Sequence, residues 1–156
     1  MEALFAALEG TALAQALRSS RWGYAALNAA HIFAIALLIG SVVPLNLRLL
    51  GMWRAISREA MVRVLAPVAA SGLILALLTG PLLFSVRAQE YSGVGFLQLK
   101  LAFIAVGVLS TLALCWSHGF LLKDAPRARL VGHAILSTLC WLGALVCGRL
   151  IAFAGD

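Results

Sequence analysis

The sequence is poor in charged residues, and poorest in acidic ones. Of its 156 residues only 12% are charged, and six Asp and Glu stand against twelve Lys and Arg. A soluble domain averages about 25% charged residues, so this composition argues against a water-soluble globular fold. Hydrophobic residues make up 63% of the chain. They form several apolar runs of about twenty residues, a length that crosses a bilayer.

Cysteine is also scarce. Cys115, Cys140 and Cys147 all fall inside apolar runs, and no CxxC spacing occurs. The location argues against a disulfide framework, and the spacing argues against a zinc site. We therefore interpret the three cysteines as small packing residues.

An uninterrupted apolar centre is missing from residues 1–20, which contain Glu2 and Glu9. No secretory signal is therefore evident, and we expect the first span to direct insertion. The segment is rich in Ala and Leu, with its leucines roughly on one side, which predicts an interfacial amphipathic helix on the membrane surface. Gly10 weakens that helix and marks a point where it can break.

The long apolar runs predict an all-α integral membrane fold, a four-transmembrane-helix bundle over residues 21–156. The connections are short, so neighbouring spans should be antiparallel. Each span is long enough for a hydrocarbon core of about 30 Å, and we expect membrane lipid around it. The predicted spans cover about 22–45, ending near Pro44, then 64–86, 95–121 and 129–153.

The basic residues lie mostly between the spans. Loops 46–63 and 122–129 hold seven Lys and Arg, against five on the opposite side. Positively charged loops stay on the cytoplasmic side of a membrane, which predicts that these two loops are cytoplasmic and that both termini are outside. Topology accounts for the net charge of +6, so nucleic-acid binding is not expected.

Polar and small residues inside the spans repeat at helical spacing. Each set falls on one face of a helix, and because lipid offers no hydrogen-bond partners, these faces should point at each other. Gly72, Ala76 and Gly80 would let the second span approach closely. The polar stripes are Tyr24–Asn28–His31 in the first span, Lys100–Gly107–Thr111–Cys115–His118 in the third and His133–Ser137–Cys140–Ala144–Cys147 in the fourth.

His31 lies near the middle of the first span, where an ionisable residue is costly and indicates function. Imidazole is a common haem ligand, and helical bundles build cofactor sites from inward-facing side chains. We interpret His31 as an axial ligand to haem b, with Lys100 or Arg149 pairing with the propionates. No second histidine shares its depth, so the iron is five-coordinate or Lys100 reaches it. The candidate site also includes Tyr24, Asn28 and the small residues Ala34, Ala76 and Gly107.

Other interpretations stay open. Haem can instead lie between His118 and His133, which share a depth near the cytoplasmic ends of their helices. Each of the three histidines can simply hydrogen-bond a neighbouring helix. Lys100 can extend its charge to the outer interface, and Arg149 can anchor the outer end of its helix.

Two segments resemble a known family. HIFAIALLIGSVVPLNLRLLG, with His31, Gly40 and the pair Arg48–Leu49, resembles the first span of the HemJ-type protoporphyrinogen oxidases. FLQLKLAFIAVGVL, with Lys100 early in a span, is similar to the later Lys-containing helix of that family. The closing CGRLIAF looks like small four-span bacterial membrane proteins related in pattern to CopD-type domains.

The resemblance implies a haem b-containing bundle in a bacterial inner membrane, with His31 as ligand and Lys100 as a second functional residue. The chain departs from the HemJ pattern at Asn46, Leu50 and Gly51, where the family has a tyrosine and a histidine around its Arg-Leu pair. The third span also lacks the paired histidine that follows the lysine. These differences weigh against porphyrinogen oxidation more than against haem binding.

The sequence therefore predicts a b-type cytochrome-like membrane protein in electron transfer, with quinol as an electron donor. The short loops leave little mass outside the membrane, so a partner oxidoreductase or a homo-oligomer is expected. The alternatives are a HemJ-like porphyrinogen oxidase, a cofactor-free anchor or assembly subunit, and a small transporter that uses Lys100 and the histidines as a proton relay. A copper role is weaker, because Met52 and Met61 lie in a basic loop that repels cations.

Overall fold

The protein is described by a computed structural model, which covers residues 6, 7, 9–86 and 95–151. Within these residues the regular structure is entirely α-helical, and four helices are long and apolar enough to cross a membrane. The chain is thus a multi-pass helical membrane protein, and the predicted fold class is confirmed. The helices are α2 (Ala12–Ser19), α3 (Arg21–Leu50), α4 (Arg58–Val86), α6 (Gly95–His118) and α7 (Arg127–Ile151).

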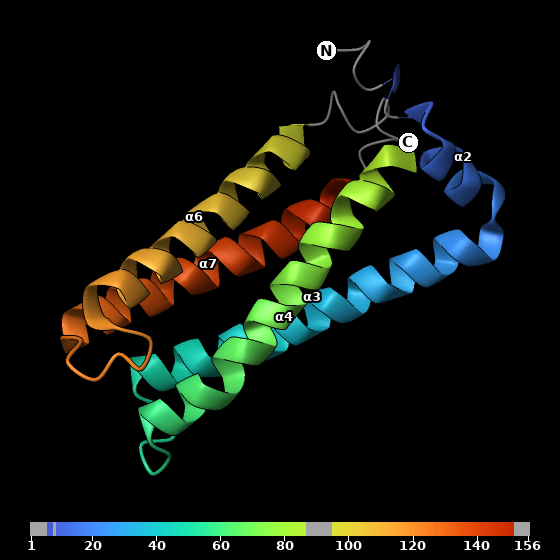
Figure 1. Cartoon of the computed structure of the whole chain (residues 1–156). Coiled ribbons are helices and arrows are strands. Elements are labelled where there is room, and N and C mark those ends of the chain that lie inside the picture. The colour runs from blue at the N-terminus through green and yellow to red at the C-terminus, as the bar shows by residue number, and fades with distance from the viewer. Residues whose placement is uncertain (1–5, 8, 87–94, 152–156) are drawn as a thin grey trace.

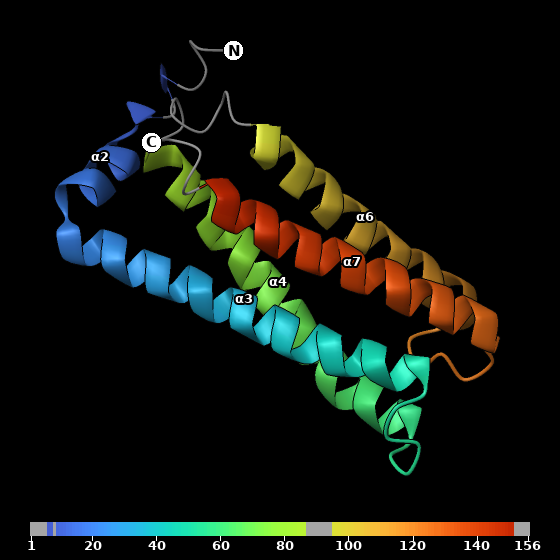
Figure 2. The same cartoon turned by 180° about the vertical axis from the view of Figure 1, so that it is seen from behind.

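The four long helices form two antiparallel hairpins, α3 with α4 and α6 with α7 (Figures 1 and 2). The hairpins are joined where α3 packs against α7, whereas α4 and α6 make little contact in the described residues. The α3–α4 and α6–α7 loops lie together at one end, which we call the loop end. The opposite end, where α2, the end of α4 and the start of α6 lie, is called the terminal end.

Helix α3 is longer than predicted, because it passes through Pro44 and ends at Leu50. Proline costs a helix one hydrogen bond, but leaving the helix inside a bilayer would expose many more unpaired backbone groups. The helix ends instead in a Schellman motif, in which Gly51 N–H donates to the Arg48 carbonyl and Met52 N–H to the Leu47 carbonyl. Gly51 has a φ of 113°, a conformation that favours glycine.

The other boundaries differ from the predictions by a few residues. Helix α4 begins at Arg58 because the Ser57 hydroxyl accepts a hydrogen bond from Ala60 N–H at 3.0 Å and caps the first turn. Helix α6 ends at His118, three residues before the predicted boundary. Helix α7 covers Arg127–Ile151, two residues earlier at its start than expected.

The predicted surface helix is broken at Gly10. Thr11 caps the second part, α2, by accepting from Ala14 N–H at 3.3 Å, and residues 1–5 and 8 lie outside the described residues. The Arg18 guanidinium donates to the carbonyl of Val86, the last residue of α4. This bond ties α2 to the terminal end of the bundle, and its placement on a membrane surface stays a prediction.

Helices α3 and α4 approach each other closely at Gly72. A Cβ on Gly72 would lie 2.8 Å from the Ala34 carbonyl oxygen and 2.7 Å from the Leu38 nitrogen. Only glycine admits the partner backbone so closely. The prediction that the Gly72 face of the second span permits close approach is confirmed at this residue.

At the loop end a cluster of buried apolar side chains draws on all four long helices and on the α6–α7 loop. The lipid-facing surface is equally apolar, with large exposed side chains along every span and with Trp22 and Trp116 exposed near opposite ends. Tryptophan is typical of the two membrane interfaces. The loop-end cluster consists of Leu49, Val62, Leu114, Leu122, Ala125, Leu130 and Ala134.

Candidate functional site

His31 is positioned by the second span. Its Nδ1 lies 2.7 Å from the hydroxyl oxygen of Thr79 on α4, and its Cε1 lies 3.4 Å from the point where a Cβ on Gly80 would stand. His31 is half-buried and Thr79 is buried. The absence of a side chain at Gly80 thus leaves room for the imidazole next to the α4 backbone.

The hydrogen bonds of Thr79 determine the tautomer of His31. The Thr79 hydroxyl has one hydrogen and donates it to the Leu75 carbonyl at 2.7 Å. We therefore assign the Thr79 oxygen as the acceptor from His31, which places the proton of the neutral imidazole on Nδ1. Nε2 then carries a lone pair, and no residue that the structure describes hydrogen-bonds to it. A neutral imidazole with an orienting bond on Nδ1 and a free Nε2 is the usual form of a metal-binding histidine.

The α6–α7 hairpin contributes Lys100 to the same region. Its Nζ lies 3.3 Å from the point where a Cβ on Gly148 of α7 would stand, so the side chain lies along α7 where glycine leaves space. The ammonium is close enough to both His31 and Cys147 for electrostatic interaction. All four long helices therefore contribute to one polar region in the terminal half of the bundle, which we call the His31 site: His31, Thr79, Gly80, Lys100, Cys147 and Gly148.

Several residues predicted for the site lie elsewhere. Asn28 is exposed, so the Tyr24–Asn28–His31 stripe does not face the bundle as a whole, and Tyr24 is only half-buried. Gly107 is buried, but a Cβ there would lie 3.3 Å from the Trp141 ring, so an indole fills the space expected for a cofactor. Arg149 is exposed in the last turn of α7.

The candidate small contacts have packing roles as well. The carbonyl of Ala34 lies against Gly72, where α3 and α4 meet, and the Ala34 side chain is fully buried. Ala76 is half-buried on the same side of α4. Gly80 lies in contact range of the imidazole, and it had been predicted only as a packing residue.

His118 and His133 form no pair in the described residues. Both are half-buried near the loop end, and the Nε2 atom of His118 is buried without a hydrogen-bond partner among those residues. The described residues therefore show no contact between these two histidines that would support the alternative with haem between them.

A second polar cluster was missed by the sequence analysis. Asn46 on α3 is buried, and its amide nitrogen donates to the hydroxyls of Ser137 and Thr138 on α7, both at 3.1 Å. Thr138 donates in turn to the Ala134 carbonyl at 2.7 Å. An asparagine among apolar residues was the available signal, because an amide in lipid needs partners on a neighbouring helix. The cluster joins the two hairpins.

The polar stripes predicted for the two later spans differ in outcome. On α7, the predicted inward face is confirmed, since Ser137, Cys140, Ala144 and Cys147 are all buried. On α6, Gly107 is buried, but Thr111 is exposed to the surroundings.

These features describe a multi-pass helical membrane protein in which one histidine of the first span is hydrogen-bonded to the second span. The described residues contain no group of three or more His, Cys, Asp or Glu that could hold a bare metal ion. A haem iron is different, because the porphyrin supplies four ligands and the protein needs to add only one or two. No family model matches the chain, and neither the curated proteins nor the solved structures give a match.

Proposed function

We propose that the protein binds haem b through Nε2 of His31 and serves as a b-type cytochrome-like component of membrane electron transfer. The observation that carries the proposal is the 2.7 Å hydrogen bond between His31 Nδ1 and the Thr79 hydroxyl, whose own hydrogen we assign to the Leu75 carbonyl. This leaves the Nε2 lone pair available for iron. A hydrogen bond on the other ring nitrogen also raises the basicity of a ligating imidazole.

The remaining residues of the His31 site suit the same ligand. Lys100 offers an ammonium for a haem propionate, and Gly80 lets the imidazole lie close to α4. The weak contact between α4 and α6 leaves the two hairpins free to adjust their separation at this level. When bound, haem would supply one-electron transfer, with quinol as a donor from the surrounding lipid and an oxidoreductase subunit or a second copy as the partner.

The proposal is tested by a reduced-minus-oxidised absorbance spectrum of the purified protein after haem is supplied. The wild type should give a b-type signal, His31→Ala should abolish it, and His118→Ala should leave it in place. A signal lost only in His118→Ala would move the ligand to the loop end. A wild type that takes up no haem would exclude the cytochrome function.

Thr79→Val sharpens the test because it keeps the side-chain volume and removes the hydroxyl. The His31 imidazole then loses its orienting partner, and we expect haem affinity to fall about tenfold, the lower end of the effect of removing such a partner. Thr111→Val is the matched control: its hydroxyl bonds only its own helix, at the Gly107 carbonyl, and its haem affinity should equal that of the wild type.

A cofactor-free anchor or assembly subunit is the second candidate, and one observation favours it. The His31–Thr79 hydrogen bond ties α3 to α4, which is also what a purely structural histidine would do. In that case the wild type stays colourless, and His31→Ala lowers stability without changing any spectrum. The HemJ-like alternative predicts that the protein restores haem synthesis in cells that lack their own protoporphyrinogen oxidase, which a pure electron carrier would not do.

A further inference from the structure

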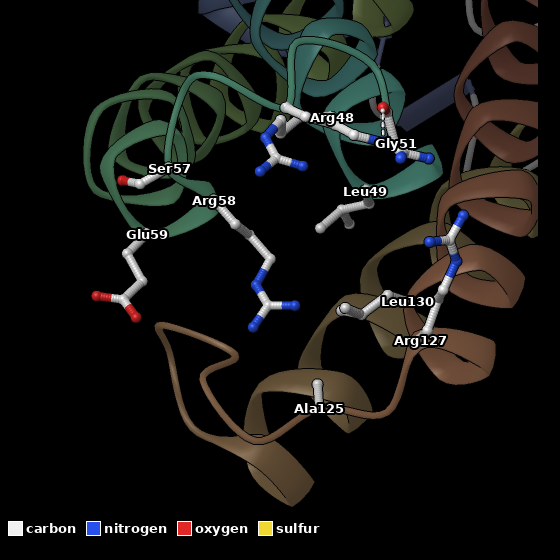
Figure 3. Close-up of a pocket in the computed structure, with 10 residues that line it drawn as sticks. Arg48, Leu49, Gly51, Ser57, Arg58, Glu59, Ala125, Arg127 and Leu130 are labelled. Atoms are coloured by element: carbon white, nitrogen blue, oxygen red, sulfur yellow. Dashed lines mark hydrogen bonds between the residues drawn. The ribbon is translucent and has the colours of Figure 1, made fainter.

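A basic pocket opens at the loop end, far along the bundle from the His31 site. Its volume is about 560 Å³, within the range of pockets that bind small ligands. Four arginines line it against one glutamate, Glu59. The lining arginines, shown with their neighbours in Figure 3, come from three separate segments of the chain and are Arg48, Arg54, Arg58 and Arg127.

Backbone carbonyls hold three of these guanidinium groups in place. Arg48 Nε donates to the Ile56 carbonyl at 2.7 Å, Arg54 Nε to the Gly51 carbonyl at 3.3 Å, and Arg58 Nη2 to the Lys123 carbonyl at 2.9 Å. Each of these bonds uses one of the five N–H donors of a guanidinium. The side chains are thus oriented while most of their donors remain available to a ligand.

The positive charges are crowded, and Glu59, the one carboxylate that lines the pocket, forms no ion pair with them. Nη2 atoms of Arg54 and Arg127 both lie within 4 Å of the point where a Cβ on Gly51 would stand, at 3.7 and 3.8 Å. No described carboxylate forms an ion pair with any of the four arginines; the ion pair found in those residues is Arg18–Glu9 at the terminal end. Like charges held this close repel each other unless an anion lies between them.

Arg58 gives the most direct sign of a missing partner. Its Nε is buried and has no hydrogen-bond partner among the described residues, although a buried unpaired donor is costly and rare. Figure 3 shows its guanidinium in the middle of the pocket, between Glu59 at one side and Arg127 at the other. The pocket also contains the first residues of both α4 and α7, and the N-terminus of a long helix favours an anion.

We propose that this pocket binds a phosphate group. Guanidinium groups match phosphate oxygens through paired hydrogen bonds, and the ends of membrane spans lie at the depth where lipid phosphates occur. Basic pockets between spans are a recurring form of lipid-headgroup site. The phosphate is carried by an anionic lipid of the adjoining leaflet or by a soluble phosphate compound, and the chemistry at the arginines is the same.

The test uses the full chain in a maltoside detergent, which carries no phosphate of its own. Dihexanoyl phosphatidylglycerol and inorganic phosphate are titrated separately by calorimetry at equal ionic strength. We expect the wild type to bind at least one of them and Arg58→Gln/Arg127→Gln to bind it at least tenfold more weakly. Binding of both probes identifies a phosphate site open to soluble compounds, whereas binding of the lipid alone identifies the leaflet as the source.

Arg63→Gln/Arg129→Gln is the matched control. It removes the same two charges from the same two helices at exposed positions that do not line the pocket, and it should weaken binding less than threefold. Equal losses in both double variants would mean diffuse surface charge and overturn the proposal, as would a wild type that binds neither probe. If the glutamine pair fails to fold, Arg58→Lys/Arg127→Lys keeps both charges and removes the planar fork, and binding should still weaken severalfold.

Discussion

At the loop end the four spanning helices share one apolar cluster, whereas towards the terminal end polar groups face each other and α4 stays apart from α6. The loop-end cluster takes a side chain from each long helix, including Leu49 of α3 and Leu114 of α6. The His31 site instead relies on a few polar contacts, chiefly His31 with Thr79. Figures 1 and 2 show α4 and α6 separated at the terminal end in both views.

Packed apolar contacts and polar contacts are expected to have different roles in this protein. A well-packed apolar cluster sets the arrangement of the helices, since packing rather than hydrophobic burial drives association within lipid. A region with few packed contacts can change its spacing at lower cost. We therefore expect packed contacts, in the loop-end cluster and where two helices approach closely, to determine stability, and the polar His31 site to determine ligand binding. The following substitutions test that division.

The largest loss of stability is expected for Gly72→Ala. The new Cβ would meet the backbone of α3 at 2.7 to 2.8 Å, and backbone atoms cannot move aside, so we expect destabilisation of about 3 kcal/mol, the upper end for overpacking. Gly143→Ala makes an equally short contact, but with the Phe103 ring, which can rotate, so the loss should be about 1 kcal/mol. Chemical unfolding in detergent measures both.

Gly40→Ala is the control for this pair, because nothing lies within 4 Å of a Cβ at that position. It should cause no loss of stability. Equal losses at Gly40 and Gly72 would mean that the α3–α4 crossing does not depend on the missing side chain.

An intermediate effect is expected for Leu114→Ala, which opens a cavity in the loop-end cluster. Leu114 is buried, whereas Leu112 on the same helix is exposed to lipid. We expect a loss of about 2 kcal/mol for Leu114→Ala, the low end for buried leucine because lipid is as apolar as the core. Leu112→Ala should change the unfolding free energy by less than about 0.5 kcal/mol. The proposed haem signal should survive both substitutions.

The smallest effect is expected at the link between the hairpins. Asn46→Ala removes the two donors to Ser137 and Thr138 and should cost about 1 kcal/mol, a typical value for a hydrogen bond between spans. A double-mutant cycle with Ser137→Ala isolates the shared part of that energy. Strictly additive losses would show that the amide and the hydroxyl do not stabilise each other.

The architecture could be predicted from the sequence because the hydropathy of the chain directly indicates where it crosses the membrane. Long apolar runs fix the number of spans, and short connections fix their antiparallel order. Helix ends were less predictable. Pro44 suggested that the first span ends there, but the helix continues through the proline and ends at Leu50, where Gly51 forms the C-cap. The orientation of the bundle across the membrane rests on loop charge alone and stays a prediction.

The site was predictable only in part. His31 and Lys100 stand out as ionisable residues inside apolar runs, and the structure brings them into one region. Thr79 was missed because a threonine in a helix usually bonds its own backbone, as this one also does. Asn28 was assigned by spacing to the face of His31, but helical spacing does not fix how much of a face the neighbours cover, and the structure leaves Asn28 exposed.

The hydrogen bond between His31 and Thr79 uses Nδ1 and leaves Nε2 for any other partner. Nδ1 donates to Thr79 in the neutral imidazole, and it would still donate if Nε2 took up a proton or a metal. The hydrogen bond that links α3 to α4 can therefore form whether the imidazole is neutral, protonated or bound to a metal. A ligand on Nε2 would therefore leave the His31–Thr79 link between α3 and α4 in place.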